Sequence, residues 1–216
     1  MNHPRIWAPV LFLFSPFFTC YAYESYYPMS EGAVYHYSAF KAVEPLKELH
    51  VSLIFTGPVN ENEKGFLWCR ADTMDLAYLL KEEPTGIYMK AMRYPVPFLG
   101  FMTTDVFFSE PTMILKYPVN EGDEWANTLN ARASVFLFDF RDSVYLRYKT
   151  IKTGEIKVEG RTVKYCVVET TLTDKDKKEV KEKHVYAQGV GYIESETRDH
   201  KLRLIGKNGV YFNKEE

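Results

Sequence analysis

The residues that can do chemistry are few in this sequence and form no reaction motif. Asp139 and Asp142 lie three positions apart, and a pair of carboxylates is what acid–base hydrolysis of glycosides uses. They flank a predicted turn, however, where solvated acids are ordinary. The chain has no Gly-x-Ser-x-Gly elbow, no His-Glu-x-x-His and no Walker loop. We therefore expect a protein that is not an enzyme, with an unrecognised hydrolase as the catalytic alternative.

Metal and cofactor sites are not indicated either. Gly189 and Gly191 flank Val190, but the third glycine of a dinucleotide fingerprint is missing. We interpret this short run as a turn or bulge between two strands. The histidines are scattered and have no ligand spacing with one another or with the cysteines. We expect no cofactor and no metal.

The first 22 residues have the order of a secretory signal peptide. Arg5 precedes the apolar run from Ile6 to Phe18, and the small residue Ala22 ends the segment. The run is too short to span ~30 Å of hydrocarbon as a helix. We expect export to the periplasm or secretion, with cleavage after Ala22. In a rival interpretation Cys20 is lipid-modified and anchors the chain to a membrane.

Two cysteines, Cys69 and Cys166, remain in the exported chain. An oxidising compartment permits a disulfide between them, which would close a loop of about 97 residues and stabilise the fold by ~2–4 kcal/mol. The alternative is two separate buried thiols, since free cysteine behaves as a small hydrophobic residue. The sequence leaves both open.

Composition favours a single β-domain over residues 23–216. The chain has 216 residues, of which 16 are Tyr, 15 Phe and 3 Trp, and aromatic side chains fit pleated sheets. The net charge of −2, with no basic cluster, argues against a nucleic-acid partner, because phosphate neutralisation needs concentrated Lys and Arg.

Short aromatic and β-branched segments separated by turn signals follow residue 33 and predict an all-β, mainly antiparallel sheet, barrel or sandwich. Arg141-Asp142 is interpreted as a turn, and the charge run from Asp174 to Lys183 as a solvated hairpin tip. The one helical candidate in the mature chain is Asp72 to Lys81, although Ala77 to Leu80 fits a strand equally well.

An internal echo suggests two similar halves. Residues 27–35 and 117–125 both read Tyr-Pro-x-x-Glu-Gly-x-x-aromatic, 90 residues apart. Proline fixes φ before the turn, glycine allows the reversal, and the aromatic residue anchors the strand that follows. The matched positions are Tyr27, Pro28 and Gly32 in the first copy and Tyr117, Pro118, Gly122 and Trp125 in the second.

A longer pattern contains the second echo. Pro118 and Gly122-x-x-Trp125 are followed by Val158-x-Gly160 and then by Tyr186-Ala187-x-Gly189-Val190-Gly191. This order resembles a family of exported bacterial proteins of unknown function, similar in fold to the lipoprotein carriers of the envelope. The resemblance covers most of residues 26–195 and implies a curled antiparallel sheet or half-barrel with no catalytic residues. Gln188 stands where that pattern commonly has Pro.

An envelope carrier of a lipid or other apolar molecule is the function we favour from the sequence. An alternative is a scaffold module whose open sheet edge pairs with another envelope protein. Phe136, Phe138 and Phe140 share one face of a strand by period two, which favours an aromatic pocket lining. Ordinary core packing explains any one of these side chains as well. The candidate lining residues are Phe55, Trp68, Met89, Phe136, Phe138, Phe140 and Tyr165.

Overall fold

The computed structural model describes residues 25–41, 49–58, 61–72, 76–95, 103–135, 138–173, 177–197, 200–208 and 210–211. The predicted signal segment 1–22, with Cys20, lies outside these residues. In the described part the chain is all-β, and the one helical element is a single 3-10 turn at Glu61–Glu63.

Thirteen strands account for almost all of the described chain. They are β1 (Val34–Lys41), β2 (Leu49–Thr56), β3 (Leu67–Ala71), β4 (Ala77–Glu83), β5 (Gly86–Pro95), β6 (Thr103–Lys116), β7 (Glu124–Val135), β8 (Phe138–Val158), β9 (Arg161–Thr173), β10 (Glu179–Ala187), β11 (Gly191–Glu196), β12 (His200–Lys207) and β13 (Val210–Tyr211).

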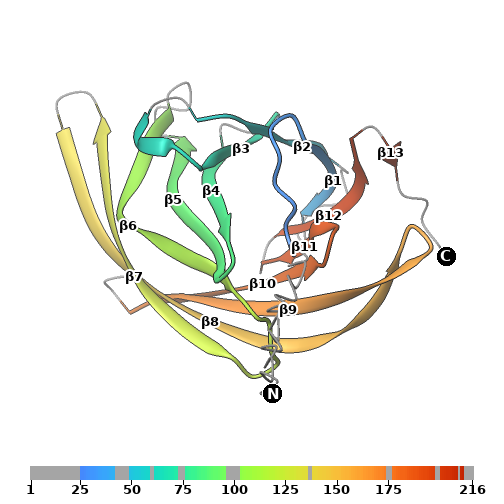
Figure 1. Cartoon of the computed structure of the whole chain (residues 1–216). Helices are drawn as coiled ribbons and strands as arrows, with labels where there is room; N and C mark the ends of the chain where they lie inside the picture. Colours follow the sequence, from blue (N-terminus) through green and yellow to red (C-terminus); the bar gives the residue numbers. More distant parts are fainter. Residues whose placement is uncertain are drawn as a thin grey trace, which may run out of the picture.

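Each strand pairs with the next, and β1 also pairs with β12, so the sheet closes into a barrel of twelve strands (Figure 1). The resemblance predicts a half-barrel, whereas the observed sheet closes completely. Seven Cα pairs from Tyr35 to Lys41 join β1 to β12 and remove the two free edges that a half-barrel would have. The hairpins β7–β8 and β8–β9 extend beyond the barrel on opposite sides (Figure 1).

The two echoes form equivalent turns at their glycines, as the repeat predicts, although Tyr117-Pro118 is a cis peptide bond and Tyr27-Pro28 is not. Gly32 has φ of +82° and Gly122 has φ of +87°, and β1 or β7 follows directly. Gly32 N donates to Phe55 O at 2.9 Å, and Gly122 N donates to Thr150 O at 2.8 Å. Phe55 and Thr150 lie in β2 and β8, each the second strand of its half. The barrel thus divides into β1–β6 and β7–β12, each opened by a Tyr-Pro turn.

We expect Gly122→Val to lower the free energy of unfolding by about 1–3 kcal/mol, because an L side chain is strained at this φ. A Cβ at Gly122 would meet no atom within 4 Å, so the cost comes from the backbone conformation alone. Gly122→Asn is the matched variant, since asparagine tolerates the left-handed region better, and it should cost less. Urea denaturation measures both. Equal stability of the valine variant and the wild type would contradict this account.

Two local predictions are wrong, and the structure decides a third between its two alternatives. Residues 77–81 of the helical candidate lie in β4, so the strand alternative given for Ala77 to Leu80 is the one observed. The predicted turn at Arg141-Asp142 lies inside β8, where the ladder to β7 runs on past both residues. Part of the charge run, from Glu179 onward, belongs to β10 rather than to a hairpin tip.

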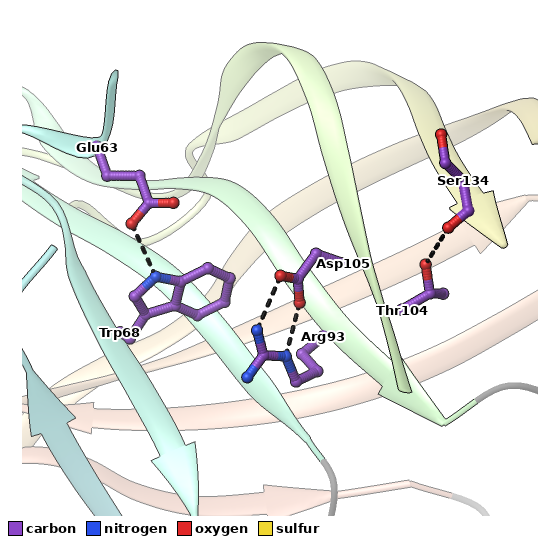
Figure 2. A network of polar contacts seen from close by, with 6 residues as sticks. All are labelled: Glu63, Trp68, Arg93, Thr104, Asp105 and Ser134. Atoms are coloured by element: carbon purple, nitrogen blue, oxygen red, sulfur yellow. Dashed lines mark hydrogen bonds and ion pairs between the residues drawn. The ribbon is translucent and has the colours of Figure 1, made fainter. Parts of the chain in front are cut away.

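A second apolar cluster lies outside the barrel interior. It comprises Phe66, Trp68, Ala77, Leu79 and Ala91. Trp68 Nε1 donates to Glu63 Oε2 at 2.9 Å (Figure 2). The guanidinium of Arg93 lies 5.4 Å from the centre of the Trp68 ring. It also donates twice to Asp105, at 2.6 and 2.8 Å. These contacts cover the outer face of β3, β4 and β5.

The two halves meet weakly at β6 and β7. The ladder there contains three Cα pairs, from Val106 to Phe108. On one side of it Thr104 Oγ1 donates to Ser134 O at 3.1 Å (Figure 2). On the other side Trp125 Nε1 and Asn127 Nδ2 both donate to Met113 O, at 3.1 and 3.0 Å. Side chains thus bind carbonyls where the backbone ladder stops.

Candidate functional site

The barrel has two distinct ends, because neighbouring strands are antiparallel. We call the end where β1 begins the near end, and the end where β1 finishes the far end. The segment before β1, blue in Figure 1, enters at the near end and lies within the barrel outline. Its Tyr27 is 4% exposed, and its ring lies 5.6 Å from Phe55, 5.9 Å from Tyr35 and 6.4 Å from Tyr186. Tyr27 therefore fills the near half of the interior.

A half-buried carboxylate fixes this segment. Glu82, at the end of β4, accepts hydrogen bonds from Ser25 Oγ at 2.6 Å and from the Tyr117 hydroxyl at 2.7 Å. Tyr26 N donates to the same Tyr117 hydroxyl at 3.2 Å. Burial raises the pKa of Glu82 above its ordinary value, while the bond from Ser25 acts in the opposite direction. The second Tyr-Pro tyrosine, Tyr117, thus holds the segment that carries the first.

Toward the far end, inward-facing apolar side chains are only partly buried. These far-end residues lie close to the strand ends and pack on the core, yet solvent reaches each of them. They come from nine strands and are Ala39, Ala71, Tyr78, Met92, Val106, Ala131, Val144, Leu172 and Leu202. Among the described residues, the inward side chains on the side away from Tyr27 are thus apolar and partly exposed.

One wall of the far half carries a polar chain of three residues. His184 Nε2 lies 3.5 Å from Glu182 Oε2, and His184 Nδ1 lies 3.1 Å from the Tyr192 hydroxyl. The Tyr192 ring packs on Tyr186, with centroids 5.4 Å apart, and so ties this chain to the filled half. The hydrogen bond with His184 holds the pKa of Glu182 below its ordinary value. Glu182 therefore presents an ionised carboxylate at neutral pH.

Thr170 adds a hydroxyl without a partner. It is 8% exposed and lies directly opposite Glu182 in the β9–β10 ladder, so both side chains point to the same face. Within the described part of the chain, its Oγ1 is buried and has no hydrogen-bond partner. A buried hydroxyl left unpaired costs ~1–3 kcal/mol, so this position suits a molecule that can hydrogen-bond to it. The polar site is thus Thr170, Glu182, His184 and Tyr192.

Comparisons with known proteins assign no family. No protein-family model matches the chain, and no curated protein sequence is significantly similar to it. The hypothetical lipoprotein YmcC of Escherichia coli is similar in structure, with 7% identity and a TM-score of 0.41 over 82% of this chain and 88% of that one. A candidate lipoprotein of Parabacteroides distasonis has 14% identity and a TM-score of 0.41 over 85% of this chain and 98% of that one. At these values neither likeness assigns a function, and export stays a prediction.

The structure brings together only part of the predicted lining. Phe55 and Met89 belong to the interior core, at 0% and 8% exposure. Trp68 lies on the opposite face of β3 from the interior residue Cys69, in the outer cluster. Tyr165 precedes the interior residue Cys166 and packs outside, beneath the Lys152 ammonium, which lies 5.9 Å from the centre of its ring. The lining residues were chosen by side-chain size and position in the strand, and these two criteria do not distinguish the inner face of the barrel from its outer face.

The predicted aromatic strand face is only partly described. Phe136 lies outside the described residues, and Phe138 and Phe140 belong to β8 with their backbone alone described. They pair with Val135 and Ala133. Of the two acids near them, Asp142 is exposed on β8, and Asp139 has only its backbone described.

Both cysteines are free thiols, so the disulfide left open by the sequence does not form in this structure. Cys69 and Cys166 are 1% and 0% exposed within the interior core. Burial raises the pKa of each thiol to about 12, which keeps both protonated and unreactive.

Sequence reasoning missed the polar site because Glu182, its carboxylate, lies in the charge run from Asp174 to Lys183. Val180, Glu182, His184 and Tyr186 alternate with outward residues, and this period of two was the available signal. The lysines between them, Lys181 and Lys183, made the whole stretch look solvated.

The turn of Gln188, Gly189 and Val190 confirms the interpretation of the glycine run, since it joins β10 to β11. A Cβ at Gly191 would come within 3.0 Å of Tyr35 and 3.1 Å of Tyr27, so glycine there makes room for the near-end aromatic residues.

Two recesses lie elsewhere. A cleft of about 860 Å³ under the β8–β9 hairpin is lined largely by polar side chains, among them Arg161, Lys164, Gln188 and Lys207. A recess of about 340 Å³ beside Met29, Leu67 and Lys81 is smaller. Neither is lined by any of the far-end residues.

Within the described residues, no group of three or more His, Cys, Asp or Glu side chains is placed to hold a metal ion. In the same part of the chain, no helix has the length and apolar character to cross a bilayer.

Proposed function

We propose that the protein is an exported carrier that binds an apolar or amphiphilic small molecule at the far end of the barrel and catalyses no reaction. The observation that carries this proposal is the set of nine inward-facing apolar side chains that remain partly exposed there. Soluble proteins normally bury inward-facing apolar surface, and apolar concavities with a few polar groups are the usual ligand sites. The sequence supports export through its signal-like first 22 residues.

Tyr27 supports the assignment of the site to one end. Because the Tyr27 ring is buried in the near half, we place the ligand in the far half. The alkyl part would contact the far-end residues, while Thr170 and Glu182 would face its polar part. Burying an alkyl chain yields ~25 cal/mol per Å² before binding costs, which is enough for about micromolar affinity.

The scaffold alternative has less support. It needs an open sheet edge, and closure of β1 on β12 removes that edge over seven Cα pairs. Within the described residues, the remaining edge positions lie in the two-residue strand β13, at the β6–β7 junction, where side chains bind carbonyl groups, and along the parts of the β7–β8 and β8–β9 hairpins that extend beyond the barrel.

Titration of the purified, delipidated protein with a fluorescent fatty-acyl probe tests the proposal. We expect saturable binding, and we expect Val106→Asp to weaken it at least about tenfold, since a charge would face the apolar chain. The matched control is Phe107→Asp on the next residue of β6. Phe107 is 39% exposed and points away from the interior, so this variant should bind like the wild type.

Circular dichroism and urea denaturation must show that both variants are folded. Equal affinity of Val106→Asp, Phe107→Asp and the wild type would overturn the far-end site. Absence of saturable binding in the wild type would overturn the carrier function.

A further inference from the structure

The far half of the interior is acidic as well as apolar. Glu182 and Asp142 are carboxylates on the inward side there, and no lysine or arginine with a described side chain occupies an inward strand position beside them. Asp142 pairs with Ala131 in the β7–β8 ladder and is exposed. Glu182 has a side chain 40% exposed, so it is reachable from solvent. An anionic head group would meet like charge.

The neighbouring His184 does not make the charge of this wall positive. With Glu182 ionised, the Glu182–His184 pair carries a charge of −1 or 0, depending on whether His184 is neutral or protonated. Neither state is positive. A carboxylate or phosphate head therefore gains no ion pair from the described wall, whereas an ammonium head gains one.

The hydrogen-bond acceptors on this wall also favour an ammonium head group. His184 approaches Oε2 of Glu182, and within the described residues no contact engages Oε1. The Thr170 hydroxyl, opposite Glu182 in the ladder, is buried and unpartnered. An N–H donor placed between them satisfies both oxygens, and a primary ammonium has three such donors.

We propose that the ligand is a cationic amphiphile, with an ammonium head bound by Glu182 and Thr170 and an alkyl chain packed against the far-end residues. This inference rests on the proposed carrier function and names its ligand class. Glu194, ion-paired with Lys201 at 2.9 Å, pairs with Val185 and Arg203 on the outward side of β11 and provides a matched control.

Isothermal titration with dodecylamine, dodecanol and dodecanoate, each below its micelle concentration at neutral pH, tests the head group with the alkyl chain held constant. We expect dodecylamine to bind at least about tenfold more tightly than dodecanoate, with dodecanol between them. In Glu182→Gln this preference should fall to about twofold or less, while dodecanol binds as before. Thr170→Val should weaken dodecylamine and dodecanol about fivefold each, the loss of one hydrogen bond. Glu194→Gln should leave all three affinities unchanged.

The outcomes separate the two proposals. Equal or tighter binding of dodecanoate by the wild type overturns the cationic head group, and so does an unchanged preference in Glu182→Gln. When the cationic head group is overturned in this way, the carrier function still stands if dodecanol binds to the wild type and Val106→Asp weakens that binding. If none of the three compounds binds, the carrier function itself fails.

Discussion

Replacing Gly86 by alanine is expected to lower the free energy of unfolding by about 3–5 kcal/mol. Gly86 opens β5 with φ of +152°, a conformation that L side chains rarely adopt. An added Cβ would collide with the backbone carbonyl oxygen of Leu115 on β6, which cannot rotate away as a side chain can. The neighbouring pair Ile87 and Leu115 is 0% exposed, so any shift of β5 disturbs the core.

Gly160→Ala is the control that isolates the collision. Gly160, in the β8–β9 turn, has φ of +72°, and a methyl group added there would meet no atom within 4 Å, so it tests backbone strain alone. We expect it to cost about 1–2 kcal/mol. Urea denaturation followed by tryptophan fluorescence measures both variants. If Gly86→Ala cost no more than Gly160→Ala, the collision with β6 would not be the cause.

Local sequence signals predicted the individual strands better than the closure of the sheet into a barrel. The Tyr-Pro-Gly repeat anticipated the two equivalent glycine turns before β1 and β7. Closure depends on the ladder between β1 and β12, whose partners Tyr35 and Lys207 are 172 positions apart. Single-strand periodicity contains no information about such a distant partner, so an open sheet and a closed barrel give the same pattern.

The site was harder to predict than the fold for a related reason. A strand with apolar residues on both faces, such as β3 or β4, does not reveal which face is inside. Trp68 therefore looked like a lining residue, although it packs in the outer cluster. Glu182 looked like part of a solvated charge run, although cross-strand register places it opposite Thr170 on the inner face. Register is a tertiary property, fixed by the neighbouring strands.

Replacing Tyr27 by alanine is expected to lower the free energy of unfolding by about 3–5 kcal/mol, the usual cost of removing a large buried aromatic ring. The ring packs against Tyr35, Phe55, Tyr186 and Tyr192, with centroids 5.6–6.4 Å away. Tyr27→Phe keeps these contacts and loses only the weak contact of its hydroxyl with Cys69 Sγ at 3.8 Å. It should therefore cost about 1 kcal/mol or less.

Under the proposed far-end site, Tyr27 would also limit how deep a ligand reaches, because its buried ring occupies the near half of the interior. In Tyr27→Ala the space vacated by the ring joins the far half, so longer alkyl chains should gain affinity relative to shorter ones. In the wild type and in Tyr27→Phe, the gain in affinity with each added methylene should stop at a shorter chain length than in Tyr27→Ala. Titration with a series of alkylamines of increasing length measures this, with urea denaturation and circular dichroism confirming the fold of each variant. An identical chain-length limit in Tyr27→Ala and Tyr27→Phe, with both folded, would show that the ligand does not approach the barrel centre from the far end.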